Sequence, residues 1–241
     1  MSRPYFDYGP RRQRNSLFGA IQMWSITIWL VAINVAVYVV DQLSNQKLTL
    51  WGAFSATTAL HQFQLWRFLT FQFLHANNEH IIFNMIALYF FGPIVEDYLG
   101  RGRYLAFYLL CGVSGAATYM LLMRICGHAL DLTPDTPLVG ASAGIFGILI
   151  ASVRVVPDAR VMLLFPPIPM KLRTVVWLFI GWAVLAILRE IFRIGNYANA
   201  NAGGEAAHLG GALLGFILIR KPQLLKVFDF GRRRWPPRGQ W

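Results

Sequence analysis

Six long apolar segments dominate this 241-residue chain and limit the folds that are open to it. They cover residues 23–41, 79–98, 104–123, 139–156, 172–188 and 204–219. A helix needs about 20 apolar residues to cross a bilayer, with latitude for tilt. Backbone amides cannot stay unpaired in hydrocarbon, and the segments lack the polar–apolar alternation of barrel strands. We therefore expect an all-α, polytopic membrane protein with six transmembrane helices.

The composition agrees with this fold class. Charged residues make up 14% of the chain, whereas a soluble domain carries about 25%. The net charge of +11 would raise the question of nucleic acid in a soluble protein. Here the basic residues lie mainly in the tails and short loops, so membrane topology accounts for them. We expect the lipid bilayer as a partner and no nucleic acid.

The distribution of the basic residues predicts the orientation. With six spans and the N-terminus inside, 17 of the 22 Lys and Arg residues lie on the inner side. This matches the positive-inside rule. We expect a membrane domain at 23–220 between basic cytosolic tails at 1–22 and 221–241. The compact form suggests the inner membrane of a bacterium.

The segment 51–74 does not fit a seventh span. It is aromatic and apolar, but polar residues interrupt it: His61, Gln62, Gln64, Arg67 and Gln72. A seventh span would also move the basic C-terminal tail to the outer side. The segment is too polar to span and too apolar for a solvated loop, so we expect an interfacial or partly embedded loop.

Ser142 and His208 are polar residues inside predicted spans, where polar groups are costly and often functional. In the predicted topology both lie at a similar, shallow depth below the outer surface. Small residues at three- and four-residue spacing would let their two helices approach closely. These are Gly140, Gly144 and Gly147 in one span and Ala207, Gly211 and Gly215 in the other.

A contact between these two side chains would have a chemical purpose. A serine hydroxyl becomes a strong nucleophile when a base within hydrogen-bond reach takes its proton, and histidine titrates near neutrality. No Asp lies near His208, which favours a dyad. Glu205, one turn earlier, could face the same side as an orienting third member, or be solvated at the mouth of the span.

A second polar pair lies in the second span. His80 and Asn84 are four residues apart and share one helix face. With the Ser142 N–H they could stabilise an oxyanion. His75 and His80 are five apart, which would turn them away from each other on a helix. We therefore expect no metal site, and we expect no cofactor.

Each of these residues also has an ordinary structural interpretation. A serine in a span commonly bonds to its own helix, a buried histidine is commonly structural, and glycine-rich faces are common packing surfaces. Ser, His, Asn and His at one predicted depth on three spans are difficult to explain by packing alone.

Five stretches, in order, resemble the rhomboid family of intramembrane serine proteases. They are Trp66-Arg67, FLHANNEHIIFN at 73–84, the stretch from Gly92 through Glu96 to Gly100, GASAGIFG at 140–147 and AHLGG at 207–211. The order and approximate spacing agree over residues 23–220. Any one of these motifs is weak, but five in order are specific.

The resemblance implies a six-helix fold that opens to the outer face, with Ser142 as nucleophile and His208 as base. It maps the oxyanion residues onto His80 and Asn84, and it implies a membrane-lying hairpin in the first outer loop, with Trp66. The fifth span and the loop before His208 would act as lateral gate and lid. Substrates would be single-span membrane proteins cut in or near their transmembrane segment.

Two residues depart from the family pattern. Ala143 follows the expected nucleophile, where Gly is frequent, and its methyl group could crowd the helix contact. Phe146 stands where many members carry a Tyr stacked on the catalytic imidazole. Phe146 keeps the ring and loses the hydroxyl. Together with Gly140, Phe146 is expected to support the site, and activity is expected to survive both departures.

Two other functions compete with a protease. A non-catalytic membrane protein on the same fold would bind or retain client transmembrane helices without Ser142-dependent cleavage. A small transporter would carry polar groups through the full membrane depth or show an inverted repeat, whereas polarity here is confined near one leaflet. The sequence leaves the substrate and the oligomeric state open.

Overall fold

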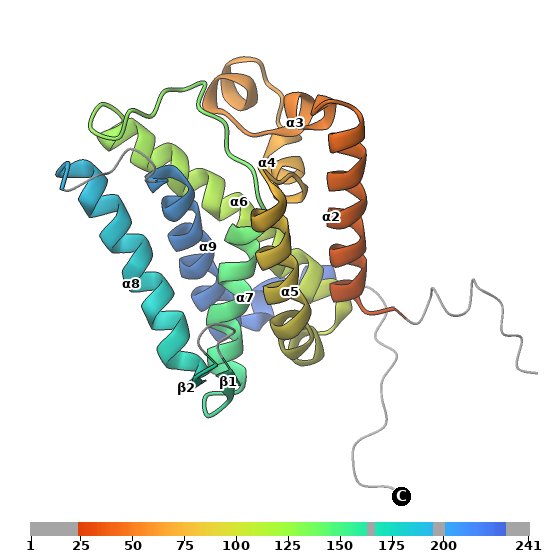
Figure 1. The fold of residues 1–241 in the computed structure, drawn as a ribbon. Coiled ribbons are helices and arrows are strands. Elements are labelled where there is room, and N and C mark those ends of the chain that lie inside the picture. The colour runs from red at the N-terminus through yellow and green to blue at the C-terminus, as the bar shows by residue number, and fades with distance from the viewer. Residues whose placement is uncertain (1–23, 163–166, 195–200, 230–241) are drawn as a thin grey trace, which may run out of the picture.

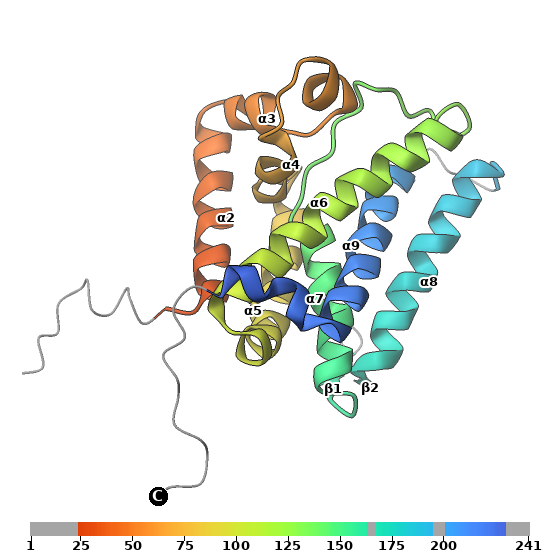
Figure 2. The ribbon, with the colours of Figure 1, turned by 180° about the vertical axis from the view of Figure 1, so that it is seen from behind.

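The computed structural model describes residues 24–162, 167–194 and 201–229, and most of them are helical. Six long helices overlap the six predicted apolar segments, in one bundle with α2 at one edge and α8 at the other (Figures 1 and 2). They are α2 (Ile26–Leu43), α5 (Asn78–Leu99), α6 (Arg101–Cys126), α7 (Ser142–Val155), α8 (Leu172–Ile191) and α9 (Ala202–Arg220). The predicted helical bundle of a polytopic membrane protein is confirmed.

Five of these helices are long and apolar enough to cross a membrane: α2, α5, α6, α8 and α9. The helix α7 has 14 residues, which is about 21 Å at 1.5 Å per residue and less than the bilayer core of about 30 Å. The predicted span 139–156 is longer than α7 because residues 139–141 approach the helix in non-helical or capping conformations. The count of six spans therefore stays a prediction.

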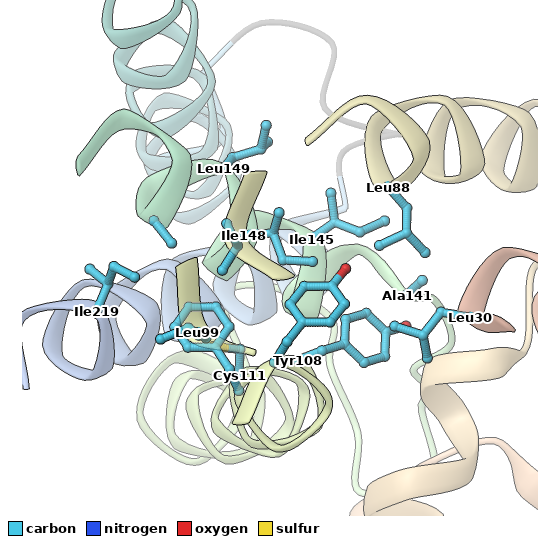
Figure 3. Packing of buried hydrophobic residues seen from close by; sticks show 14 of the residues in the cluster. Leu30, Leu88, Leu99, Tyr108, Cys111, Ala141, Ile145, Ile148, Leu149 and Ile219 are labelled. Atoms are coloured by element: carbon cyan, nitrogen blue, oxygen red, sulfur yellow. The ribbon is translucent and has the colours of Figure 1, made fainter. Parts of the chain in front are cut away.

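The helix α7 occupies the centre of the bundle, where it packs against α5, α6, α8 and α9. Its buried residues Ile145 and Ile148, with Ala141 just before the helix, join one hydrophobic cluster with Tyr108 of α6 and Leu88 of α5 (Figure 3). All five side chains are at most 2% exposed. This cluster fixes the start of α7 on one side.

Small residues bring α7 and α9 into backbone contact on the other side. A Cβ atom on Gly211 would overlap the carbonyl group of Ala143, and one on Gly215 would lie 2.6 Å from the Cα of Gly147. The predicted small-residue contact between these helices is thus confirmed for Gly147, Gly211 and Gly215.

Two glycines that were predicted for this contact lie elsewhere. A Cβ on Gly144 would lie 2.7 Å from the ring of Tyr108, so this residue faces α6. A Cβ on Gly140 would lie 2.8 Å from the imidazole of His80 in α5. The prediction was wrong for both because Gly140 precedes α7 and Gly144 is rotated toward another neighbour.

The segment 51–74 folds into short helical turns. They are the end of α3 (Lys47–Gly52), the π-helical turn η1 (Thr57–His61), α4 (Arg67–Thr70) and the 3-10 turn η2 (Phe71–Phe73). Large apolar side chains are exposed along this segment, including Trp51, Phe63 and Leu65. That this loop lies in the membrane stays a prediction.

Two short elements were not predicted. The strands β1 (Arg160–Met162) and β2 (Pro169–Lys171) form an antiparallel hairpin between α7 and α8. The 3-10 helix η3 (Pro222–Phe228) follows α9 and packs against α6, with Leu225 buried. The predicted N-terminal tail 1–22 and residues 230–241 of the C-terminal tail lie outside the described residues.

Candidate active site

Ser142 is the first residue of α7, and a short extended segment leads to it. Leu138 exchanges two backbone hydrogen bonds with Phe54, and the Gly140 N–H donates to the Phe71 carbonyl at 2.9 Å. The loop 51–74 therefore holds the backbone just before Ser142. This pairing was not predicted from the sequence.

His208 lies in the second turn of α9 and meets Ser142 across the helix contact. Its Nε2 is 2.8 Å from the Ser142 Oγ. The two residues are 66 positions apart in the chain, and the close approach of α7 and α9 brings them together. The hydroxyl and the imidazole are placed for proton transfer, as a nucleophile and its base require.

The ring of Phe146 stacks on the imidazole of His208. The two rings are nearly parallel, with an angle of 5° and centroids 4.3 Å apart. Phe146 lies one turn after Ser142, so both contacts to His208 come from the same face of α7. The stack expected from the resemblance forms without the tyrosine hydroxyl.

Glu205 contacts the other nitrogen of the imidazole. Its Oε2 lies 2.9 Å from the Nδ1 of His208, one turn further along the same helix. The side chains of His208 and Glu205 are 19% and 17% exposed, so protein covers most of each. Of the two possibilities left open from the sequence, the structure favours contact over full solvation.

His80 and Asn84 lie in the first two turns of α5, on the side of Gly140. The Cβ position of Gly140 is 2.8 Å from the His80 Nε2 and 3.5 Å from the Ser142 Oγ, so both side chains lie next to Gly140. Asn84 is buried, and its Nδ2 has no hydrogen-bond partner among the described residues. A buried amide donor without a partner is available to an oxygen of a bound substrate.

A family model for the rhomboid domain matches residues 62–221, which include Ser142, His208, Phe146, Glu205, His80 and Asn84. The chain belongs to the rhomboid family. It is therefore a multi-pass membrane protein with the family's helical bundle.

Curated relatives include two proteins named as rhomboid proteases. The chain is 30% identical over 191 residues to rhomboid protease GluP of Bacillus subtilis, covering 79% of this chain and 32% of the relative. It is 28% identical over 227 residues to rhomboid protease AarA of Providencia stuartii, covering 84% and 75%. RHOMBOID-like protein 12, mitochondrial, of Arabidopsis thaliana is 27% identical, covering 80% and 56%. The chain thus spans about a third to a half of the length of the first and the last of these.

Two further predicted residues of this rhomboid, Trp66 and Arg67, lie in the loop 51–74 and not at Ser142. The Arg67 guanidinium is buried and donates to the carbonyls of Ala53 and Leu50 and to the side chain of Gln64. The indole of Trp66 stacks on Trp51. The backbone of the same loop pairs with residues 138–140 through Phe54 and Phe71, and support of the site by Trp66 and Arg67 stays a prediction.

The sequence left open whether the methyl group of Ala143 crowds the helix contact. A Cβ on Gly115 of α6 would lie 2.5 Å from the Cβ of Ala143, so the methyl group points at α6. The backbone of Ala143, and not its side chain, faces Gly211. Because Gly115 has no side chain, it leaves space for the methyl group of Ala143, where other family members often have glycine.

His75 and His80 were predicted to diverge, and this was wrong. Their rings meet edge to face with centroids 5.1 Å apart, because His75 lies in the segment before α5 and not on the helix. Burial, and then the neighbouring His80, lower the pKa of His75 to about 3. The described residues contain no group of three or more His, Cys, Asp or Glu side chains that could hold a metal ion.

Proposed function

We propose that this protein is an intramembrane serine endopeptidase that cleaves single-span membrane proteins in or near their transmembrane segment. The observation that carries the proposal is the 2.8 Å contact between the Ser142 Oγ and the His208 Nε2. Membership of the rhomboid family, with relatives named as proteases, supports the same reaction class.

The proposed mechanism uses the contact between Ser142 and His208. His208 takes the proton from Ser142 as the hydroxyl oxygen attacks the substrate carbonyl carbon. The Ser142 N–H, the Asn84 amide and the His80 imidazole stabilise the resulting oxyanion. His208 then protonates the leaving amine. Water that reaches the partly exposed His208 hydrolyses the acyl-enzyme and regenerates Ser142.

The topology that completes the proposal places both termini in the cytoplasm and the site near the outer face of a bacterial inner membrane. The distribution of 17 of the 22 basic residues supports this orientation. A substrate helix would enter laterally past α8. The segment between α8 and α9 would be the lid, and its residues 195–200 lie outside the described part of the chain.

The test measures cleavage of a model single-span substrate by purified protein in liposomes, beside Ser142→Ala and His208→Ala. A fluorophosphonate that modifies activated serines is used in parallel, since its reaction does not depend on the choice of substrate. We expect the wild type to cleave the substrate and to be labelled at Ser142, and both variants to lose both reactions. Cleavage by Ser142→Ala at the wild-type rate would refute the proposal. A folded wild type that takes up no phosphonate but binds transmembrane helices would favour the client-binding alternative.

A further inference from the structure

We propose that Glu205 is a positioning residue for His208, so that the site works as a Ser142–His208–Glu205 triad and not as a dyad. The inference rests on the proposed protease function. It concerns the group that fixes the imidazole and stabilises the charge that forms on it.

The two nitrogens of His208 have different partners. The Nε2 is 2.8 Å from the Ser142 Oγ, and the Nδ1 is 2.9 Å from the Glu205 Oε2. An ionised carboxylate only accepts hydrogen bonds, so its partner Nδ1 must carry a proton. In the neutral imidazole this leaves Nε2 unprotonated, which is the form that can accept the proton of Ser142. Glu205 thereby selects the reactive tautomer.

Glu205 is held in place by the first turn of α9. The Asn201 side chain caps this turn by accepting from the Gly204 N–H, and the Ala202 N–H donates to the carboxylate of Glu190 in α8. The partial positive charge at a helix N-terminus also stabilises a carboxylate in the first turn. The local structure therefore gives the first turn of α9, and with it Glu205, a defined position.

The stack with Phe146 restrains the imidazole of His208 but does not determine which nitrogen carries the proton. Phe146 covers one face of the imidazole and so limits tilting of its ring. A phenyl ring forms no hydrogen bond with either nitrogen, so it cannot choose between tautomers. Among the described residues, Glu205 supplies the carboxylate hydrogen-bonded to His208, and His80 of α5 is the titratable group that faces it from a neighbouring helix.

The role in the reaction is electrostatic. When Ser142 attacks, its proton moves to Nε2 and the imidazole becomes positively charged. The Nδ1 proton stays on His208 and is donated to Glu205, which stabilises the imidazolium without taking the proton. A glutamine at 205 could still accept this hydrogen bond through its carbonyl but carries no charge. An alanine would remove both effects.

The experiment compares wild type, Glu205→Gln, Glu205→Ala and the control Glu79→Gln in liposomes. Glu79 is an exposed carboxylate in the first turn of α5, so it matches Glu205 in charge and helix position. We expect kcat to fall about tenfold in Glu205→Gln and about a hundredfold in Glu205→Ala, with KM unchanged within about twofold. Phosphonate labelling of Ser142 should slow in the same order, and Glu79→Gln should match the wild type. Wild-type kcat in both Glu205 variants, or a loss confined to KM, would overturn the inference.

A second measurement is made on the wild-type protein. The 15N NMR spectrum of wild-type protein labelled at histidine reports which nitrogen of His208 carries the proton, with His208→Gln assigning the signal. We expect protonation at Nδ1, and protonation at Nε2 in the neutral ring would overturn the inference. A wild type that neither cleaves nor reacts with the phosphonate refutes the protease proposal instead, so the two failures are distinct.

Discussion

Gly140 is the residue whose backbone most directly sets the geometry of the candidate site. Its φ of +132° lies in a region that side-chain-bearing residues rarely adopt. Its Cβ position is also only 2.8 Å from the His80 Nε2. Two separate constraints therefore require glycine immediately before Ala141 and Ser142.

We expect Gly140→Ala to reduce both stability and cleavage. Backbone strain at such a position is worth about 1–3 kcal/mol, and the added methyl group would displace His80. The control is Gly100→Ala, because Gly100 has a φ of +81° but nothing within 4 Å of its Cβ position. Thermal unfolding and substrate cleavage are measured for both. Gly100→Ala should lose stability only, and equal activity of the two variants would contradict the role of the His80 contact.

For single residues, the sequence predicted the contact between Ser142 and His208 correctly, but it did not predict the contacts of Glu205 and His75. Ser142 and His208 could be paired because their motifs imply two helices in contact at one depth. The contact of Glu205 could not be decided, since three-residue spacing is equally compatible with a solvated carboxylate at a helix start. The error at His75 was avoidable: Asn77 caps α5 by accepting from the His80 N–H, and an Asn before an apolar run is a helix-start signal.

The loop 51–74 is the element that connects the periphery to Ser142. Arg67 of α4 donates hydrogen bonds to the carbonyls of Ala53 and Leu50. Phe54, which follows Ala53 in the chain, pairs with Leu138 in the segment that leads to Ser142. The loop is therefore a structural support for the start of α7, whatever its position relative to the bilayer.

We expect Arg67→Ala to destabilise the loop and, through residues 138–140, to lower activity. Hydrogen bonds from a charged group are worth about 1.5–3 kcal/mol each, and the loss leaves carbonyls without donors. Thermal unfolding in detergent measures the effect, with Arg124→Ala as the control because Arg124 is exposed at the end of α6. Equal unfolding temperatures of the two variants would refute this role of Arg67.

The contact of α7 with α9 makes a second prediction at the scale of elements. Gly211→Ala would force the added methyl group into the carbonyl of Ala143, so the helices must separate and the Ser142–His208 contact must lengthen. We expect loss of cleavage together with a stability loss of about 1–3 kcal/mol from overpacking. The control is Gly181→Ala in α8, whose Cβ position has nothing within 4 Å. Retained cleavage in Gly211→Ala would contradict the close approach.

The apolar segments predicted the long helices. They did not predict where α7 begins, and they did not predict the short hairpin of β1 and β2. The residues 139–141 are as apolar and small as the helix that follows, so hydropathy could not show that α7 begins at Ser142. The three-residue strands of the hairpin are too short for an alternating pattern to emerge. Both features depend on contacts with distant segments, which one sequence does not display.

The whole molecule distributes its apolar residues differently from a soluble bundle. The helices α7 and α9 contact their neighbours mainly through small buried residues, while α8 exposes large ones such as Trp177, Leu178 and Trp182. A soluble protein of this size would not leave a whole helix face of this kind in water. In a bilayer, lipid can surround these large apolar side chains, so burying them does not hold the helices together. Close packing of the small residues inside the bundle stabilises it instead.

The stability of the whole fold should depend on pH through His75. The pKa of His75 is lowered by burial from its ordinary 6.5 to about 3. Above pH 6.5 the group is neutral in both states, whereas below it the unfolded chain binds a proton that the folded protein excludes. The free energy of unfolding should therefore fall by about 1.4 kcal/mol per pH unit, or about 2 kcal/mol between pH 6.5 and 5. Denaturation of His75→Gln across this range should show a slope smaller by this amount. Identical slopes for wild type and His75→Gln would mean that His75 is protonated in the folded bundle as readily as in the unfolded chain.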